Sequence, residues 1–204
     1  MKLYDSVGPN PHVVRMFLAE KGLDVPTQKV DIRGGENRRA PYNIEVNAAG
    51  QCPALQLDEG SVITEITAIC EYVEDMHPEP ALIGSTPQEK AETRMWVRRI
   101  DLNIYEPSLN GFRYAEGLEM FKDRVHCIPQ AADDLKAAAR EKLAWLDGLM
   151  AGKTYIAGDR LTLADILLYC YSVFAERVGQ PLDPELNNIA GWLGRMKERP
   201  SGAA

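Results

Sequence analysis

The sequence has no long apolar run, few histidines and no surplus of positive charge. A helix needs about 20 consecutive apolar residues to span a bilayer, and no stretch of the 204 residues approaches that length. The formal net charge of -7 argues against a general surface for nucleic acid or for an anionic membrane. The opening stretch, MKLYDSVGPN, is interrupted by Asp5 and Gly8, so we expect no secretory signal there.

Metal-binding patterns are also missing. The chain has 4 cysteines and 3 histidines, which are scattered and form no CxxC pair and no spacing typical of zinc ligands. We therefore expect no metal site, and we expect the cysteines to be reduced thiols in the cytoplasm. One local exception to the acidic charge is the basic cluster of Arg33, Arg38 and Arg39, which would suit a small anion.

What the sequence does contain is two regions with different hydrophobic patterns. Residues 1–80 alternate between strand and helix patterns in the order β-α-β-α-β-β-α, which predicts an α/β domain with a mixed sheet. In the first helix we expect Asn10 at the N-cap, Pro11 at the first helical position and Gly22 after the end. The helix between the first two strands favours a parallel pairing of those strands.

A proline-rich segment separates this α/β domain from the rest of the chain. We place a linker at residues 81–88 and an all-helical domain at residues 89–204, because no strand pattern follows the prolines. Apolar residues recur there at helical spacing, and DILLYCYSVF is apolar on nearly all sides, as in the central helix of a bundle. Thr162 and Asp165, just before it, have the spacing of a capping box.

Four segments together resemble the cytosolic glutathione S-transferases. They are SVGPNPHVVRMFLAEKG, AAGQCPALQLDEGSVITEITAICEYVE, YIAGDRLTLADILL and WLGRMKERPS, and they cover both domains in the same order. The resemblance implies a thioredoxin-like N-terminal domain that binds glutathione, an all-α C-terminal domain that forms the electrophile site, and a homodimer. Within the family, the sequence is most similar to bacterial and fungal members that lack the usual tyrosine, serine or cysteine catalyst.

The resemblance implies a glutathione site assembled from several segments. In the family, the proline matching Pro53 has a cis peptide bond, which turns the backbone of Cys52 towards the cysteinyl part of glutathione as an added strand. Glu65 and Ile66 match the start of a helix whose amides suit the γ-glutamyl carboxylate. Ile66 lacks the hydroxyl that the family commonly has there, and Glu65 could instead simply complement the helix dipole. Two further positions match polar ligand contacts but could equally be ordinary loop polarity: Asn37 and Gln51.

The turn from Gly8 to Pro11 is the expected place of the glutathione sulfur. The activating serine of some relatives falls at Gly8 and the cysteine of others falls at Asn10, so neither side chain is present. A free thiol has a pKa of about 8.5, and a helix N-terminus contributes up to ~2 kcal/mol, which is roughly 1.5 pKa units. The helix start with Asn10 would therefore ionise about half of the glutathione, unless Asn10 caps its own helix.

Further candidates for catalysis come from the helical domain and from Cys52. In fungal relatives without the usual catalyst, polar side chains hold a water near the sulfur, and the matching region here contains Asn110, Arg113 and Tyr114. These three residues could equally be a polar helix end. A thiol at Cys52 could form a mixed disulfide with glutathione, although a small buried hydrophobic residue is the simpler interpretation.

We therefore predict a cytoplasmic, homodimeric glutathione S-transferase that serves detoxification. Glutathione is the co-substrate, activated as a thiolate for attack on an electrophilic small molecule or a disulfide, and no metal, nucleic acid or membrane takes part. Two alternatives stay open. Asn10 and Cys52 favour a glutathione-dependent disulfide reductase, whereas Gly8 and Ile66 favour a non-catalytic module that binds glutathione or another ligand.

Overall fold

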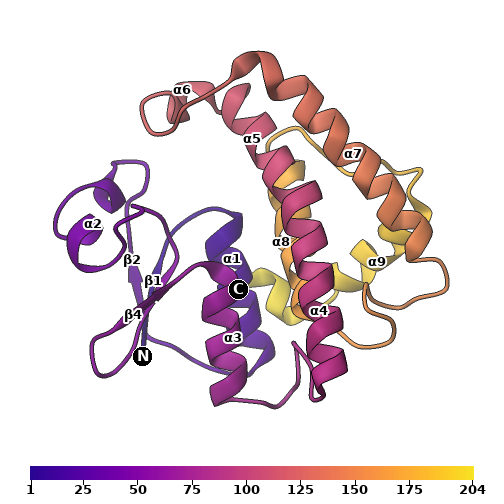
Figure 1. Cartoon of the computed structure of the whole chain (residues 1–204), viewed down its shortest axis with the longest axis horizontal. Helices are drawn as coiled ribbons and strands as arrows, with labels where there is room; N and C mark the ends of the chain where they lie inside the picture. The colour runs from indigo at the N-terminus through magenta and orange to yellow at the C-terminus, as the bar shows by residue number, and fades with distance from the viewer. The chain divides into compact units, whose positions relative to one another are not determined.

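The computed structural model describes all 204 residues, which divide into two compact units. The first unit comprises Met1–Ser85 together with Arg199–Ala204, and the second comprises Thr86–Glu198. In chain order (Figure 1), the elements of the first unit are β1 (Lys2–Asp5), α1 (Pro9–Glu20), β2 (Thr27–Lys29), η1 (Glu36–Arg38), α2 (Tyr42–Glu45), β3 (Ala54–Gln56), β4 (Val62–Thr64), α3 (Ile66–Met76) and η4 (Pro200–Ala203).

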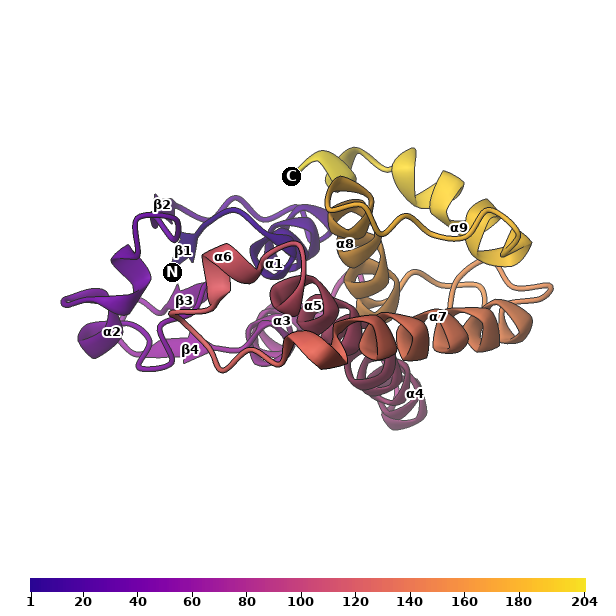
Figure 2. The same cartoon turned by 90° about the horizontal axis from the view of Figure 1, so that it is seen from above.

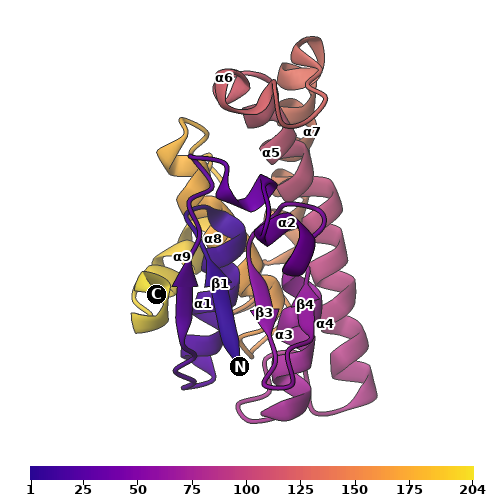
Figure 3. The same ribbon diagram turned by 90° about the vertical axis from the view of Figure 1, so that its left-hand side faces the viewer.

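The first unit is built on a four-stranded mixed sheet with the strand order β2-β1-β3-β4. The strand β1 runs parallel to β2 and antiparallel to β3, and β4 completes a hairpin with β3. The helices α1 and α3 lie side by side against the sheet (Figure 3), and α1 buries Val13, Met16 and Phe17 there. This arrangement confirms the thioredoxin-like domain predicted for the start of the chain.

The helix α1 begins two residues earlier than predicted. Its N-cap is Gly8, with φ 120° and ψ 172°, and Pro9 is the first helical residue, so Asn10 and Pro11 lie inside the first turn. Either proline has the fixed φ that suits a first helical position. The choice falls on Pro9 because Gly8 adopts backbone angles that are essentially restricted to glycine. The predicted end is correct, since Gly22 follows the helix with φ 67°.

The second unit is all-helical, which confirms the predicted fold class. The helix α8 is buried on nearly all sides, α7 packs beside α5 (Figure 2), and Thr162 and Asp165 form the predicted capping box. No helix of the structure has both the length and the apolar character needed to cross a membrane. The elements are α4 (Pro87–Ile100), η2 (Asp101–Tyr105), α5 (Glu106–Tyr114), α6 (Leu118–Phe121), η3 (Pro129–Ala131), α7 (Ala132–Leu149), α8 (Leu163–Arg177) and α9 (Asn187–Lys197).

The helices α4 and α5 are joined by a wider, π-helical turn, η2. Pro107, in the first turn of α5, has no N–H to donate to the carbonyl of Asn103, and its ring would crowd that carbonyl in an unbroken α-helix. A π-helical turn is a common way to accommodate such a break. In the same turn, the side-chain amide of Asn103 donates a hydrogen bond to the Arg99 carbonyl at 2.9 Å.

The segment predicted as the linker, residues 81–88, is divided between the units after Ser85. Its first part is firmly packed, because Leu82 and Ile83 are buried and their backbone N–H groups donate to the carboxylate of Glu74 at 3.2 and 2.7 Å. The buried ammonium of Lys21 pairs with the same carboxylate. The end of the α/β unit is thus attached to α1 and α3.

The last six residues differ from the prediction, which assigned them to the helical domain. Residues 199–204 belong to the first unit, because Arg199 and Ser201 donate to the carboxylate of Glu20 on α1. The ring of His12 also contacts the Gly202 carbonyl at 3.1 Å. These side-chain contacts join residues about 180 positions apart in the chain, so helical periodicity could not reveal them.

Candidate functional site

Two helices of the first unit begin without a side-chain cap. The helix α1 follows Gly8 and α3 follows Glu65, and neither start has a side-chain hydrogen bond to its first turn. In the second unit, α4 and α8 begin with a capping box, whereas α5, α7 and α9 have no side-chain cap. The N-caps Gly8 and Glu65 differ from all of these in having a positive φ. An N-terminus without such a cap is a place where a bound anion can complement the helix dipole.

The turn that starts α1 combines an unusual backbone with few donors. Pro9 and Pro11 have no N–H, so Gly8 and Asn10 carry the backbone donors of the turn. Asn10 is half-buried and lies inside the first turn, not at the N-cap, whereas Pro11 is buried. The N-cap position predicted for Asn10 is therefore occupied by Gly8, which has no side chain.

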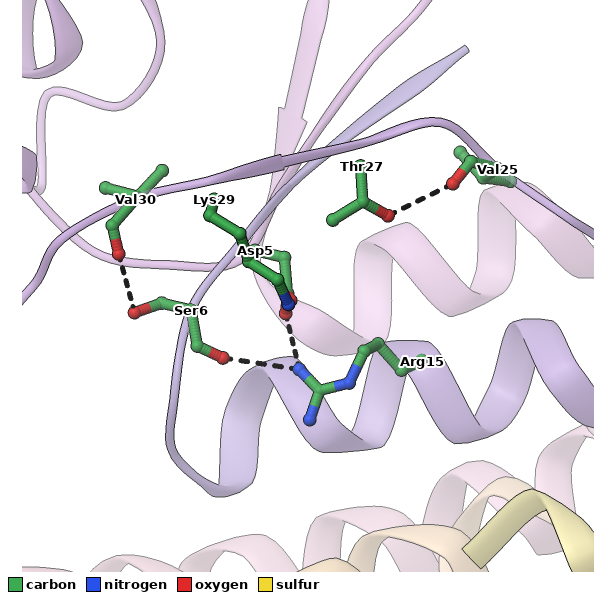
Figure 4. Close-up of polar contacts among 7 residues, drawn as sticks. All are labelled: Asp5, Ser6, Arg15, Val25, Thr27, Lys29 and Val30. Carbon is green, nitrogen blue, oxygen red and sulfur yellow. Dashed lines mark hydrogen bonds and ion pairs between the residues drawn. The ribbon is translucent and has the colours of Figure 1, made fainter. Parts of the chain in front are cut away.

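The end of β1, which leads into this turn, is tied to both neighbouring elements (Figure 4). Asp5 is completely buried, and its carboxylate pairs with Arg15 of α1 and with Lys29 of β2. Arg15 also donates to the Ser6 carbonyl at 3.2 Å. The buried Ser6 hydroxyl donates to the Val30 carbonyl at 3.0 Å, so it supports the fold and does not face a ligand.

The backbone before β3 is held from behind by two side chains. The Gln51 carbonyl accepts hydrogen bonds from the Tyr42 hydroxyl at 2.7 Å and from the Asn47 amide at 3.0 Å. The Cys52–Pro53 peptide bond is cis, as the resemblance implied. Pro53 is buried, whereas the Gln51 side chain is exposed. The residues predicted to pair with glutathione through their backbone thus lie on a well-supported segment.

The Cys52 thiol belongs to a hydrophobic cluster with Tyr42 and Val30. Its sulfur lies 3.2 Å from the Tyr42 hydroxyl. Burial raises the pKa of the Cys52 thiol, which outweighs the lowering effect of the Tyr42 hydrogen bond, and the charges of Asp5 and Glu36 add to the rise. Only a thiolate exchanges with disulfides. The structure therefore favours the simpler interpretation of Cys52 as a packed hydrophobic residue.

Glu65 has a strained backbone. Its φ of 68° makes it the only residue other than glycine with a positive φ, a conformation that costs on the order of 1–3 kcal/mol and that clusters at ligand sites. The side chain of Glu65 is exposed, and Ile66 is the first residue of α3. Both residues therefore lie at an uncapped helix start, where the resemblance placed the γ-glutamyl group.

Asn37 is buried, and its side chain supports the loop before Gln51. The Asn37 amide nitrogen lies 2.5 Å from the Gly50 carbonyl and donates to it. The side-chain oxygen is also buried and has no hydrogen-bond partner in the protein. An amide that faces Gly50 in this way positions the backbone next to the site, and a direct contact between Asn37 and a ligand stays a prediction.

The candidates of the second unit form a local network on α5. The Arg113 guanidinium donates to the Asn110 side-chain oxygen at 2.9 Å, and the Asn110 amide lies 3.4 Å from the Glu106 carboxylate. Arg113 and Glu106 are 3.6 Å apart. Residues three and four apart share one face of a helix, so the structure brings Asn110 and Arg113 together. Tyr114 ends the same helix and is half-buried.

Several residues of the site were missed by sequence reasoning. The largest group is the buried pairing of Asp5 with Arg15 and Lys29. A carboxylate inside the apolar strand pattern LYDS was a usable signal, because charged residues are rarely buried without a partner. Tyr42 and Asn47 left no such signal, since their partner is a backbone carbonyl.

The comparisons with known proteins agree with this geometry. The family model for the glutathione S-transferase N-terminal domain matches residues 7–76, and the model for the C-terminal domain matches residues 125–200. Glutathione S-transferase 2 of Saccharomyces cerevisiae is 32% identical over 98% of this chain and 87% of its own length. A maleylacetoacetate isomerase of Pseudomonas aeruginosa is 34% identical over 93% of this chain and 89% of its own.

A solved structure extends the similarity to three dimensions. The crystal structure of Gtt2 from Saccharomyces cerevisiae matches with a TM-score of 0.92 and 30% identity, covering 100% of this chain and 99% of that one. The chain therefore belongs to the glutathione S-transferase family, and relatives of that name along most of its length confirm the predicted transferase activity.

Proposed function

We propose that this glutathione S-transferase activates glutathione at the turn from Gly8 to Pro11, without a tyrosine, serine or cysteine side chain. The observation that carries the proposal is that α1 and α3 both start at a residue with a positive φ and without a side-chain cap. The dipole of α1 favours the thiolate by up to ~2 kcal/mol, enough to ionise about half of a bound thiol near neutral pH. Asn10 then contributes to catalysis through its position in the first turn of α1, where its backbone N–H is one of the few donors.

Glutathione binds along the same unit in an extended form. Its cysteinyl part pairs with the backbone of Cys52, beside the exposed Gln51 side chain. Its γ-glutamyl carboxylate meets the start of α3 at Ile66, and its ammonium group meets the carboxylate of Glu65. The strained φ of Glu65 supports this assignment, because strain of that kind persists where a ligand site requires a particular backbone direction.

The reaction is an attack of the thiolate on an electrophilic carbon. The sulfur forms the new bond to carbon, the leaving group departs with the bonding electron pair, and the thiol proton passes to solvent. From the second unit, we propose that Asn110 and Arg113 contribute polar contacts to the electrophile, with Tyr114 beside them on α5. We also propose that the protein is a homodimer that detoxifies such electrophiles in the cytoplasm. The four cysteines, which form no disulfide, support the reducing compartment.

The two alternatives from the sequence gain no support. The disulfide reductase relied partly on Cys52, whose thiol is half-buried and has a raised pKa. The non-catalytic module relied on Gly8 and Ile66, and both stand at uncapped helix starts that suit an anionic ligand. Because one relative is named a maleylacetoacetate isomerase, maleylacetoacetate belongs in the substrate panel together with an aryl halide and a small disulfide.

The proposal is tested by isothermal titration of glutathione into the wild type and Glu65→Ala, with ultraviolet detection of the bound thiolate. Loss of a charge-assisted hydrogen bond costs about 1.5–3 kcal/mol, so we expect Glu65→Ala to weaken binding by about 10- to 100-fold. The matched control is Glu59→Ala, which removes an exposed carboxylate from the β3–β4 turn of the same unit and should leave binding unchanged.

The two measurements separate the parts of the proposal. Wild-type binding with a thiolate signal supports both the binding site and the activation. Binding without a thiolate signal would contradict activation at the α1 turn. Equal binding by Glu65→Ala and the wild type would contradict the assignment of the γ-glutamyl group to α3.

A further inference from the structure

A cluster of one buried carboxylate and two cations lies next to the turn that starts α1. Asp5 is completely buried and pairs with two cations, Arg15 and Lys29. Taking charged groups out of water is costly, and a buried ion pair often contributes less stability than well-packed apolar residues would. What such a pair supplies is a fixed geometry, because a carboxylate and a guanidinium orient each other.

That geometry is applied to the turn where the thiol is proposed to bind. Arg15 extends from α1 towards β1 (Figure 4), where it pairs with Asp5 and donates to the Ser6 carbonyl at 3.2 Å. The Val30 N–H donates to the Asp5 carbonyl at 2.8 Å, and the Ser6 hydroxyl donates to the Val30 carbonyl at 3.0 Å. Two consecutive residues before the turn are therefore held by both α1 and β2.

Charge gives the cluster a second effect. An unpaired carboxylate at Asp5 would disfavour a nearby thiolate, and the carboxylate already raises the pKa of the Cys52 thiol. One carboxylate with two cations leaves one net positive charge, which favours a thiolate instead. Arg15 is close to the turn, since six residues of helix from Pro9 span about 9 Å. The ammonium of Lys29 is mostly exposed, so solvent and salt screen its contribution more strongly.

We infer that Arg15 is a positioning residue for the transferase reaction: it fixes the β1–α1 turn through Ser6 and keeps the buried Asp5 carboxylate paired beside the bound thiol. The inference rests on the proposed activation of glutathione at that turn. Arg15 itself does not transfer a proton or touch the reacting carbon. Its task is to hold the turn and to prevent the carboxylate from opposing ionisation.

The experiment measures the pKa of bound glutathione by ultraviolet titration in the wild type, Arg15→Met, Arg15→Lys and the double variant Asp5→Asn with Arg15→Met. We expect Arg15→Met to lower the thiolate fraction at neutral pH by about 3- to 5-fold, corresponding to a rise of up to about one pKa unit. The value of kcat should fall with it, while KM for glutathione changes less than about threefold, because the contacts of Glu65 and Cys52 are kept.

The other variants separate charge from geometry. Arg15→Lys retains the positive charge and should recover most of the thiolate. The double variant removes the uncompensated carboxylate, so it should also recover the thiolate. Hydrogen exchange at residues 7–12 should nevertheless stay faster than in the wild type, because the Ser6 carbonyl still lacks its donor. Arg140→Met, at an exposed position of α7, is the matched control and should change neither measurement.

Lys29→Met keeps the test decisive if Arg15→Met does not fold. Lys29 is exposed, so this variant should fold and should lower the thiolate fraction by less than about twofold, because the lost charge is screened. A normal thiol pKa together with normal exchange at the turn in Arg15→Met would overturn the inference, as would a higher thiolate fraction in Lys29→Met. If the wild type binds glutathione without forming a thiolate, the proposed activation is contradicted. Hydrogen exchange at residues 7–12 in Arg15→Met would then decide whether Arg15 positions the turn.

Discussion

Two helices of the second unit, α4 and α8, begin with a capping box, whereas the two long helices of the first unit do not. The helices α5, α7 and α9 of the second unit also begin without a side-chain cap, but their N-cap residues have negative φ. The N-caps of α4 and α8, Thr86 and Thr162, have extended backbones with φ of -107° and -135°. The N-caps of α1 and α3, Gly8 and Glu65, have positive φ and no side-chain hydrogen bond to the helix. A side-chain cap typically contributes about 1 kcal/mol of stability, so the first unit forgoes this contribution at two places.

What sets the starts of α1 and α3 apart is the missing cap together with a positive φ at the N-cap residue. A capped helix start has already satisfied part of its positive end, and it offers less to an anion. An uncapped start retains that capacity. The proposed site of the first unit is instead supported by side chains on its inner side, by Arg15 on the β1–α1 turn and by Tyr42 and Asn47 on the Gln51 carbonyl.

The largest effect is expected from removing the buried cap of α8. The Asp165 carboxylate is completely buried and accepts hydrogen bonds at 2.9 Å from the N–H of Ile156, the N–H and hydroxyl of Thr162, and the indole of Trp192. Asp165→Ala would leave these buried donors without a partner, so we expect it to lower the free energy of unfolding by about 3–5 kcal/mol. Urea-induced unfolding measures the change.

The matched control is Thr86→Ala, which removes the exposed cap of α4 and should cost only about 1 kcal/mol. If the two substitutions lower the free energy of unfolding equally, burial adds nothing to the stability that the cap of α8 provides. The buried cap of α8 and the exposed cap of α4 would then be energetically equivalent.

A smaller effect on stability, with a larger effect on chemistry, is expected at the uncapped start of α1. Gly8→Ala forces a side chain into a backbone region almost restricted to glycine, at a cost of about 1–3 kcal/mol. No atom lies within 4 Å of the added Cβ, so the cost comes from the backbone and not from a clash. If the turn shifts to relieve the strain, the bound thiolate should decrease, which thermal unfolding and ultraviolet titration measure together.

Gly148→Ala in α7 is the control for that prediction. The added Cβ again meets no atom within 4 Å, and φ at Gly148 is not positive. Alanine has the higher helix propensity, so this substitution should stabilise the chain by up to about 1 kcal/mol. A Gly8→Ala variant that is as stable as Gly148→Ala and retains the full thiolate signal would show that the conformation of the turn is unimportant.

The other end of α1 provides a pH-dependent test. Burial raises the pKa of Glu20, but the hydrogen bonds from Arg199 and Ser201 and the charge of Arg199 outweigh it, so that the pKa lies below its usual value. A carboxylate with a lowered pKa stabilises the fold above its unfolded pKa and loses that contribution as pH falls through the folded value. We expect Glu20→Gln to cost about 1–2 kcal/mol near neutral pH, and the cost should shrink once pH falls below about 4.

Unfolding of the wild type and Glu20→Gln over a pH series measures this difference, with Glu141→Gln on the exposed face of α7 as the control. A cost that stays constant into the acid range would mean that the ionised carboxylate is not what attaches the tail to α1.

Much of the fold was predictable because its signals are local. The alternation of strand and helix patterns predicted the order of elements in the first unit, and the spacing of Thr162 and Asp165 predicted the start of α8. The segments around Pro53 and Glu65 predicted the family. The start of α1 was predicted wrongly, because Pro9 and Pro11 fit the first helical position equally well and only the path from β1 selects Pro9.

The sequence by itself determined the two fold classes and the order of their elements, because hydrophobic periodicity and capping spacings extend over only a few residues. Only the tertiary structure decided that Asp5 is buried between Arg15 and Lys29, that Asn37 faces Gly50, and that residues 199–204 join the first unit. Those outcomes depend on which distant segments meet, and the free energy of a buried charge or amide is set by the partner it finds there.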